Sequence, residues 1–502
     1  MTDVKAENRS ITIRPSRKGT PGGTASAPAP GTTRATSRRT GKANPRGATP
    51  QAGLRADRGL MDRIRRIRPA RMAVGAFVAI IVVVTGLLMA PWATASGRPA
   101  NPIDALFTAT SAVCVTGLTT VPTGEYWSTY GHVVILIGIK VGGMGIMTIG
   151  ALFTLLIVRR LRLRQRLLAA SETRTGLGEV GSLVRSVAVF STVIELVIAA
   201  TLVPRFWALG EPMGDALWHG LFYGIGAFNN AGFVPTGAGL RPFASDALVL
   251  LPIALGVFVG ALGHPALLNI FQRPLQPRRW TLSTKLTVTT SLILLGLSAP
   301  AFAIGQWNDP ATFGDMSGPA TALNSLFAAT MTRSGGFATV DMVGWHPATN
   351  VLTMVLMLIG GGPVSTAGGI KVTTFAVMLL AIRAEARGDR DIEVFRRAIP
   401  ATVLRVAVTV TTAALAFILV ATTMVATLSD APLDQVAFEV ISAFSTCGLT
   451  TGLTATLPGA GKLVLTVMML LGRLGPITLA SALALSNRRR VIRLPEERPI
   501  VG

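Results

Sequence analysis

Long apolar stretches alternate with short polar segments along most of this chain. Eight of the stretches match the length of about 20 residues that a helix needs to cross the hydrocarbon core of a bilayer. They lie at roughly residues 72–93, 131–158, 184–204, 246–272, 285–305, 349–382, 401–428 and 461–486. The pattern predicts an integral membrane protein that crosses the bilayer as helices.

Four shorter apolar segments lie between successive pairs of these stretches. They are too short to span, which predicts re-entrant helices that enter the membrane and end inside the protein. The four predicted pore helices are Pro102–Ser111, Met213–Phe228, Ala320–Met331 and Leu433–Phe444. The negative end of each helix dipole would point at the following segment and favour a cation there.

Each predicted pore helix is followed by small and hydroxylated residues that end in a glycine and then Phe or Leu. These glycines, at positions 117, 232, 336 and 448, are 115, 104 and 112 residues apart. One glycine near a helix end would indicate an ordinary cap, whereas four in equivalent places favour carbonyl oxygens that converge on one axis and replace water around a cation. The predicted fold is an all-α polytopic membrane protein with four pseudo-symmetric helix–pore loop–helix repeats around one central pore. Its predicted selectivity filter consists of Val115, Thr116, Gly117, Asn230, Ala231, Gly232, Ser334, Gly335, Gly336, Thr446, Cys447 and Gly448.

The polar segments divide the chain into an arm, four repeats and a tail. The first segment is poor in large apolar residues and rich in Ser, Thr, Pro, Gly, Ala and Arg, which predicts a disordered basic arm. The predicted divisions are the arm at 1–71, repeats at 72–160, 161–275, 276–385 and 386–487, and a tail at 488–502.

Charge is distributed unevenly between the two ends of the predicted helices. Arginine and lysine clusters follow every second apolar stretch, whereas the filter-bearing connections are acidic. We expect the chain to lie in the plasma (inner) membrane. The positive-inside rule then places both of its termini in the cytoplasm. The net charge of +23 therefore indicates contact with anionic membrane lipid rather than with nucleic acid.

The sixth apolar stretch, alone among the eight, is clearly interrupted by glycine and proline. A kink or a close helix contact is one interpretation, and a mobile gating loop that lines an aqueous cavity is the other. The candidate loop residues are Gly360, Gly361, Gly362, Pro363, Ser365, Thr366, Ala367, Gly368, Gly369 and Lys371. The lysine would either anchor the loop or extend toward the interface.

Arg473 lies inside the last apolar stretch, where an unpaired charge is costly. It should face the pore or a partner. The partners that we consider are a backbone carbonyl, Glu195 and Glu439.

Three segments resemble the potassium-uptake superfamily that includes TrkH, KtrB and the plant HKT proteins: Thr110–Leu118, Gly360–Lys371 and Gly472–Pro476. The similarity covers residues 72–502. It is greatest to the KtrB ion-translocating subunits, because one apolar stretch precedes the first filter segment here, whereas TrkH carries extra N-terminal helices. Two positions, Lys140 and His264, depart from the residues usual in the family.

The resemblance implies a homodimer with one pore per subunit on a cytoplasmic ring of nucleotide-binding regulatory (KtrA/TrkA-like) subunits. It also implies a gating role for the interrupted stretch and a cation-barrier role for Arg473. Potassium is the expected substrate, because the position of Gly117 is often occupied by serine in relatives that pass sodium. Sodium is a candidate modulator. No covalently bound cofactor is implied.

The first functional hypothesis is a channel-like translocation subunit of a Ktr/Trk-type system, in which potassium moves down its electrochemical gradient. No phosphate-binding Gly-x-x-x-x-Gly-Lys-Ser/Thr motif is present in the sequence, so nucleotide control would come from a separate partner. The alternative is a cation-coupled secondary transporter, or symporter. An intramembrane enzyme is not favoured, since no catalytic constellation stands at convincing spacing.

Overall fold

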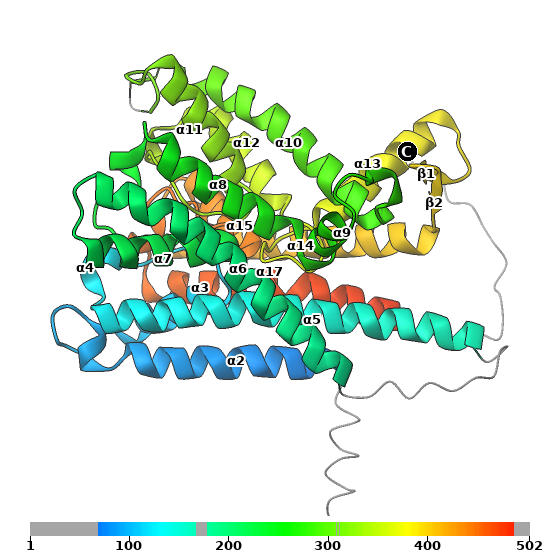
Figure 1. Ribbon diagram of the computed structural model, residues 1–502, viewed down its shortest axis with the longest axis horizontal. Coiled ribbons are helices and arrows are strands. Elements are labelled where there is room, and N and C mark those ends of the chain that lie inside the picture. Colours follow the sequence, from blue (N-terminus) through cyan, green and yellow to red (C-terminus); the bar gives the residue numbers. More distant parts are fainter. Residues whose placement is uncertain (1–68, 167–177, 308, 311, 486–502) are drawn as a thin grey trace, which may run out of the picture. The chain divides into compact units, whose positions relative to one another are not determined.

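The computed structural model describes residues 69–166, 178–307, 309, 310 and 312–485, which are mostly helical (Figure 1). Residues 1–68 of the predicted arm and the predicted tail 488–502 lie outside this description. The helices of at least eight residues are α2 (Pro69–Leu88), α3 (Pro102–Val113), α5 (Thr129–Arg166), α6 (Gly178–Ala208), α7 (Met213–Asn229), α8 (Ala247–Leu262), α9 (His264–Gln272), α10 (Leu282–Gln306), α11 (Gly318–Met331), α12 (Pro347–Leu358), α13 (Val372–Arg387), α14 (Ala401–Leu428), α15 (Leu433–Ser445) and α17 (Gly459–Leu485). Single turns of helix form α4 (Thr123–Tyr126) and α16 (Leu453–Thr456).

The four predicted pore helices are confirmed as helices α3, α7, α11 and α15, of 12, 17, 14 and 13 residues. Each begins at or beside a proline, whose fixed φ suits a first helical turn. In α3 the Asn101 side chain also accepts a hydrogen bond from the Ile103 amide at 2.9 Å. Their C-terminal halves are buried, which places the segments that follow in the protein interior.

Four helices of the described residues contain segments long and apolar enough to cross a membrane: α5, α6, α10 and α14. The bent pair α8–α9 would make a fifth. Large apolar side chains project outward from these helices, and Leu297, Ile304 and Leu419 are 68%, 81% and 69% exposed. An apolar outer surface of this kind is expected of helices that face lipid.

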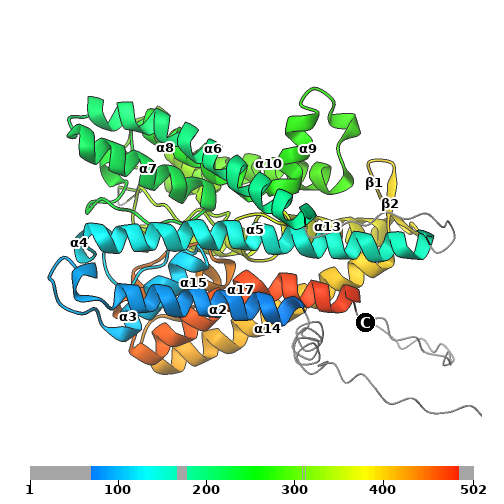
Figure 2. The same ribbon diagram turned by 60° about the horizontal axis from the view of Figure 1, so that its bottom comes forward.

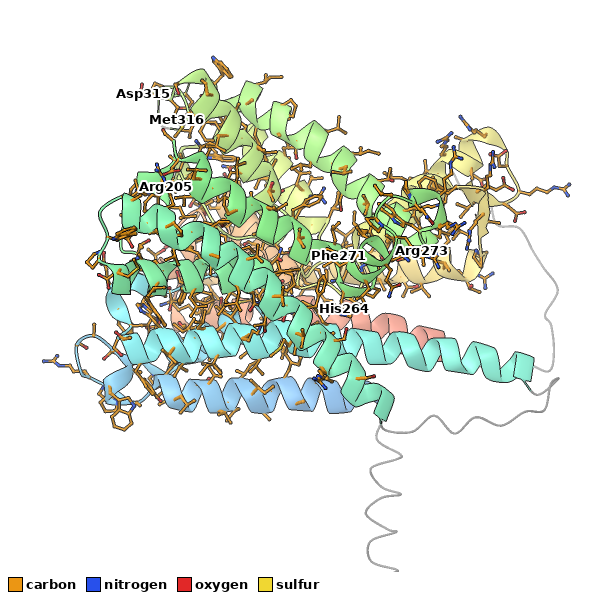
Figure 3. The ribbon with its side chains drawn as sticks, in the orientation of Figure 1. Arg205, His264, Phe271, Arg273, Asp315 and Met316 are labelled. Carbon is orange, nitrogen blue, oxygen red and sulfur yellow. The ribbon has the colours of Figure 1, made fainter. Side chains whose placement is uncertain are left out.

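The fourth apolar stretch is not continuous, contrary to the prediction that only the sixth is interrupted. Helices α8 and α9 meet at a bend of 100°. Gly263 lies there with φ 86°, and the His264 amide donates to the Val364 carbonyl at 3.2 Å instead of continuing the helix. In Figure 3, His264, Phe271 and Arg273 follow one another along α9 and the turn after it.

A short hairpin between α13 and α14 was not predicted by the all-α interpretation. Strands β1 (Ile392–Val394) and β2 (Arg397–Ile399) pair antiparallel, with Ile392 opposite Ile399. Phe395 and Arg396 form the turn with φ of 49° and 61°. This is the conformation of a two-residue hairpin turn, but the usual Asn-Gly signal is missing from its sequence.

Helix α5 lies between two groups of helices (Figure 2). It contacts α6 and α7 on one side, and α2, α3 and α17 on the other. Consequently it passes beside the ends of two pore helices, α3 and α7.

Candidate functional site

The four predicted filter glycines come together in a closed ring. A Cβ added at Gly117 would lie 2.8 Å from the Cα of Gly232, and one added at Gly232 would lie 2.9 Å from the Cα of Gly336. A Cβ at Gly336 would lie 3.2 Å from the Cα of Gly448, and one at Gly448 would lie 3.3 Å from the Cα of Gly117. The backbones are therefore so close that a side chain at any of the four positions would overlap a neighbouring segment.

The four segments also share an unusual backbone conformation. Val115, Asn230, Ser334 and Thr446 have φ of 55°, 59°, 63° and 46°. The corresponding glycines have φ of 89°, 67°, 73° and 93°. Left-handed φ is rare for residues other than glycine, above all for β-branched valine and threonine, and such strain gathers at functional sites.

Hydrogen bonds hold these segments to the pore helices. The amides of Thr116, Ala231 and Cys447 donate to carbonyls of their own pore helices at 2.7, 2.8 and 2.9 Å, which is the closing bond of a left-handed helix end. The Ser111 hydroxyl accepts from the Gly117 amide at 3.0 Å, and Ser442 does the same for Gly448 at 3.2 Å. Sequence reasoning missed both serines, although each stands six residues before its glycine.

Glycines of the long helices allow close approach behind the ring. Gly142 lies against the carbonyl of Val113, and Gly472 lies against that of Phe444. A Cβ at either glycine would overlap that carbonyl oxygen. These contacts bring α5 and α17 directly against the ends of α3 and α15.

The candidate loop, residues 360–371, separates α12 from α13, so the predicted interruption is confirmed. The Thr366 hydroxyl donates to the Asn230 side-chain oxygen at 2.7 Å, and the Gly368 amide donates to the Ser334 hydroxyl at 3.2 Å. A Cβ at Gly369 would lie 3.4 Å from the Cα of Ser445. The loop therefore touches the second and third filter segments and the helix end that leads into the fourth.

The loop is tied at both ends. The Gly360 amide donates to the Ile370 carbonyl at 2.9 Å, and the Gly362 amide donates to the Ala261 carbonyl at 2.7 Å. The Lys371 ammonium donates to the Ala367 carbonyl at 2.6 Å. Of the two interpretations of this lysine, the contact favours an anchor of the loop.

Arg473 is 3% exposed and its Nη1 donates to the Thr366 carbonyl of the loop. Its Nε and Nη2 have no hydrogen-bond partner among the described residues. Of the three partners considered from the sequence, the structure thus selects a carbonyl. Glu195 and Glu439 bind other groups.

Glu439 holds the chain that follows the fourth filter segment. It is fully buried on α15, and its carboxylate accepts from the hydroxyls of Thr450, Thr451 and Thr454 at 2.6, 3.0 and 2.5 Å. The Thr451 amide donates to it at 2.8 Å. Sequence reasoning considered this residue as a partner for Arg473 and as one of the acidic residues of the filter-bearing connections, but not as an acceptor for the threonines, which carry no local signal of their role.

We expect Glu439→Ala to lower the thermal stability of the detergent-solubilised protein markedly. The substitution leaves four donors without their acceptor, and hydrogen bonds to a charged group contribute about 1.5–3 kcal/mol each. A thermal shift of the purified protein measures the effect, with Asp434→Ala as a control at the exposed start of the same helix. Equal melting temperatures for the two variants would contradict this role.

Comparisons with known proteins agree with this architecture. The profile of the TrkH family, described as a cation transport protein, matches residues 70–489. Ktr system potassium uptake protein B of Bacillus subtilis (strain 168) is 35% identical over 445 residues, which cover 88% of this chain and 98% of that protein. Potassium/sodium uptake protein NtpJ of Enterococcus hirae is 32% identical over 463 residues, with 88% and 99% covered.

A solved structure has the same fold. The crystal structure of the potassium transporter TrkH from Vibrio parahaemolyticus superposes with a TM-score of 0.63 at 18% identity, covering 81% of this chain and 84% of that one. The family match and the apolar helices identify a membrane protein of a transporter family. On the extent of the profile match and the identity to its curated relatives, this chain belongs to the TrkH family of cation transport proteins.

Proposed function

We propose that this chain is the potassium-selective translocation subunit of a Ktr/Trk-type uptake system, with a channel-like pore between four pseudo-symmetric repeats. The observation that carries the proposal is the closed ring of Gly117, Gly232, Gly336 and Gly448. Four segments with one shared backbone conformation around an axis can replace the hydration shell of a cation with carbonyl oxygens. The names of the relatives, which include potassium and sodium uptake, point to the same substrates.

The proposed topology places both termini in the cytoplasm and the filter-bearing connections outside. Contacts between connections support it. Lys285 in the first turn of α10 lies 5.8 Å from the ring of Phe395 in the hairpin after α13, so two ends that the proposal places in the cytoplasm meet. Arg241 and Asp341 form an ion pair between two filter-bearing connections.

In this proposal residues 360–371 form the gate and Arg473 forms an electrostatic barrier beneath the filter. A cytoplasmic nucleotide-binding ring would control the loop, and two copies of the chain would form a homodimer. The loop suits a gate because two hydrogen bonds join it to the second and third filter segments, and breaking them would release it from Asn230 and Ser334.

Flux into liposomes tests the proposal. We expect the purified chain to pass potassium faster than sodium, and a cytoplasmic nucleotide-binding partner to change the potassium rate. Gly117→Ser should lower the potassium preference, because its Cβ would press on the Gly232 backbone and widen the ring. Equal rates for both ions in the unaltered protein would refute the assignment.

A secondary transporter remains the second candidate because two broken helices meet. The α8–α9 bend contacts the α12–α13 loop through the His264 amide and the Val364 carbonyl, at 3.2 Å. Broken helices at the membrane midplane form the substrate sites of many carriers. Unitary currents in planar bilayers separate the two, since a carrier gives none.

A further inference from the structure

An ion pair between a partly exposed lysine and a buried carboxylate joins three helices behind the second filter segment. The Lys140 ammonium on α5 donates to the Glu195 carboxylate on α6 at 2.5 Å, and the other carboxylate oxygen accepts from the side-chain amide of Asn229 on α7 at 2.8 Å. Ser191 and Thr192 also accept from the lysine, both at 3.1 Å. The lysine and glutamate side chains are 21% and 3% exposed. The ammonium and the carboxylate are therefore both paired where α5, α6 and α7 meet, whereas the side-chain oxygen of Asn229 has no hydrogen-bond partner among the described residues.

Such a network is an expensive way to hold helices together. Removing two charges from water costs several kcal/mol per ion, and apolar residues of similar volume often stabilise a protein equally well. Buried charged groups are instead retained in some proteins because they specify one arrangement. The arrangement specified here is that of Asn229, the residue that the carboxylate binds.

Asn229 is the last residue of α7 and directly precedes Asn230, which has the left-handed φ of 59°. Its side-chain amide donates both to Glu195 and to the Ile225 carbonyl, the latter at 2.9 Å. Gly143 of α5 contacts the side-chain oxygen of Asn229 so closely that a Cβ added at Gly143 would overlap this oxygen. The side chain is thus held between α5 and α6, just before the chain enters the filter.

The corresponding residues of the other segments are anchored differently. Arg333, which directly precedes Ser334, donates to the Ser291 carbonyl of α10 at 2.8 Å. Cys114 and Ser445 occupy the same place in the first and fourth segments. Among the described residues, only the second segment is held by an ion pair at this position.

We propose that the Lys140–Glu195 pair positions the second filter segment through Asn229 and thereby sets part of the preference for potassium over sodium. These are positioning residues, because they act on the ion through another side chain. The inference rests on the proposed function, since it assumes that residues 230–232 contact the ion.

The test measures the potassium/sodium permeability ratio of the full chain in liposomes, together with the amount of protein inserted. We expect Glu195→Gln and Lys140→Gln each to lower the ratio about fivefold. This is about the effect expected when one hydrogen bond to a charged group becomes a hydrogen bond between neutral groups. The double variant should recover more than half of the loss, because neither charge is left unpaired. Gly143→Ala should also lower the ratio, since its methyl group displaces Asn229 while both charges remain.

The matched control is another ion pair of α6. Arg205 lies at the end of this helix that leads into α7 (Figure 3) and binds Asp246 at 2.8 Å. That carboxylate caps α8 through the Leu248 amide at 3.0 Å and binds no residue of a filter segment in the contacts described. Arg205→Gln should leave the ratio unchanged.

The outcomes separate this inference from the proposed function. If the unaltered chain does not prefer potassium, both fail. If Gly117→Ser lowers the ratio while the Glu195, Lys140 and Gly143 variants lower only the inserted amount, the network is merely structural and this inference alone is overturned. Should the single charge variants fail to insert, Gly143→Ala decides by the same criterion.

Discussion

Gly232→Ala is expected to reduce potassium flux by about tenfold or more. The new methyl group would lie 2.9 Å from the Cα of Gly336, and alanine would have to adopt φ 67°. Overpacking costs about 1–3 kcal/mol, and a left-handed non-glycine residue adds a cost of similar order. Because the ring is closed, a shift of the second segment displaces its neighbours as well. Potassium-dependent tracer uptake into liposomes measures the loss.

Gly239→Ala is the matched control for this substitution. Gly239 has nearly the same φ, 64°, but nothing lies within 4 Å of a Cβ added there. The backbone strain is therefore comparable and the collision is absent. If both variants lose flux equally, strain rather than convergence of the four segments explains the effect, and the pore assignment loses its main support.

Arg473→Ala is expected to raise potassium flux by about tenfold in the absence of a regulatory partner. A unit charge about 4 Å from a cation raises its energy by about 1–4 kcal/mol in a partly aqueous environment, and two of the guanidinium nitrogens have no hydrogen-bond partner among the described residues. Removing the charge lowers that barrier. Single-channel or flux recordings on the purified protein measure the change.

Arg473→Gln distinguishes two roles of Arg473: an electrostatic barrier to the cation, and a latch, which means a hydrogen bond that holds the loop closed. Glutamine can still donate to the Thr366 carbonyl but carries no charge, so an electrostatic barrier predicts the same increase as with alanine. A latch predicts that glutamine retains low flux. Arg205→Gln is the control, because Arg205 binds Asp246 before α8 and makes no contact with the loop in the contacts described. Unaltered flux in Arg473→Ala would contradict the barrier.

Local signals in the sequence were sufficient for much of the site. Apolar length separated the short pore helices from the spans, and α14 (Ala401–Leu428) has the predicted bounds of the seventh stretch. The run of three glycines before Pro363 predicted the break between α12 and α13. Each of these features is determined by residues close together in the chain, so pattern and conformational preference are enough to find it.

Isolated signals were not sufficient. A single glycine inside an apolar stretch is common in membrane helices, so Gly263 followed by Pro265 did not suffice to predict that α8 and α9 bend by 100° there. The turn of Phe395 and Arg396 lacks the residues that favour left-handed φ. In both places contacts made elsewhere, such as the bond from His264 to Val364, stabilise the conformation.

By itself, the sequence determined where the glycine segments lie, how far apart they are and which apolar stretches surround them, because spacing and composition are properties of the chain alone. Only the tertiary structure decided which charged groups meet: Lys140 with Glu195, Arg473 with the Thr366 carbonyl, and Glu439 with three threonines. The physical reason is that a buried charge takes whichever complementary group the packing of distant helices places within hydrogen-bonding distance, and that packing depends on the whole fold.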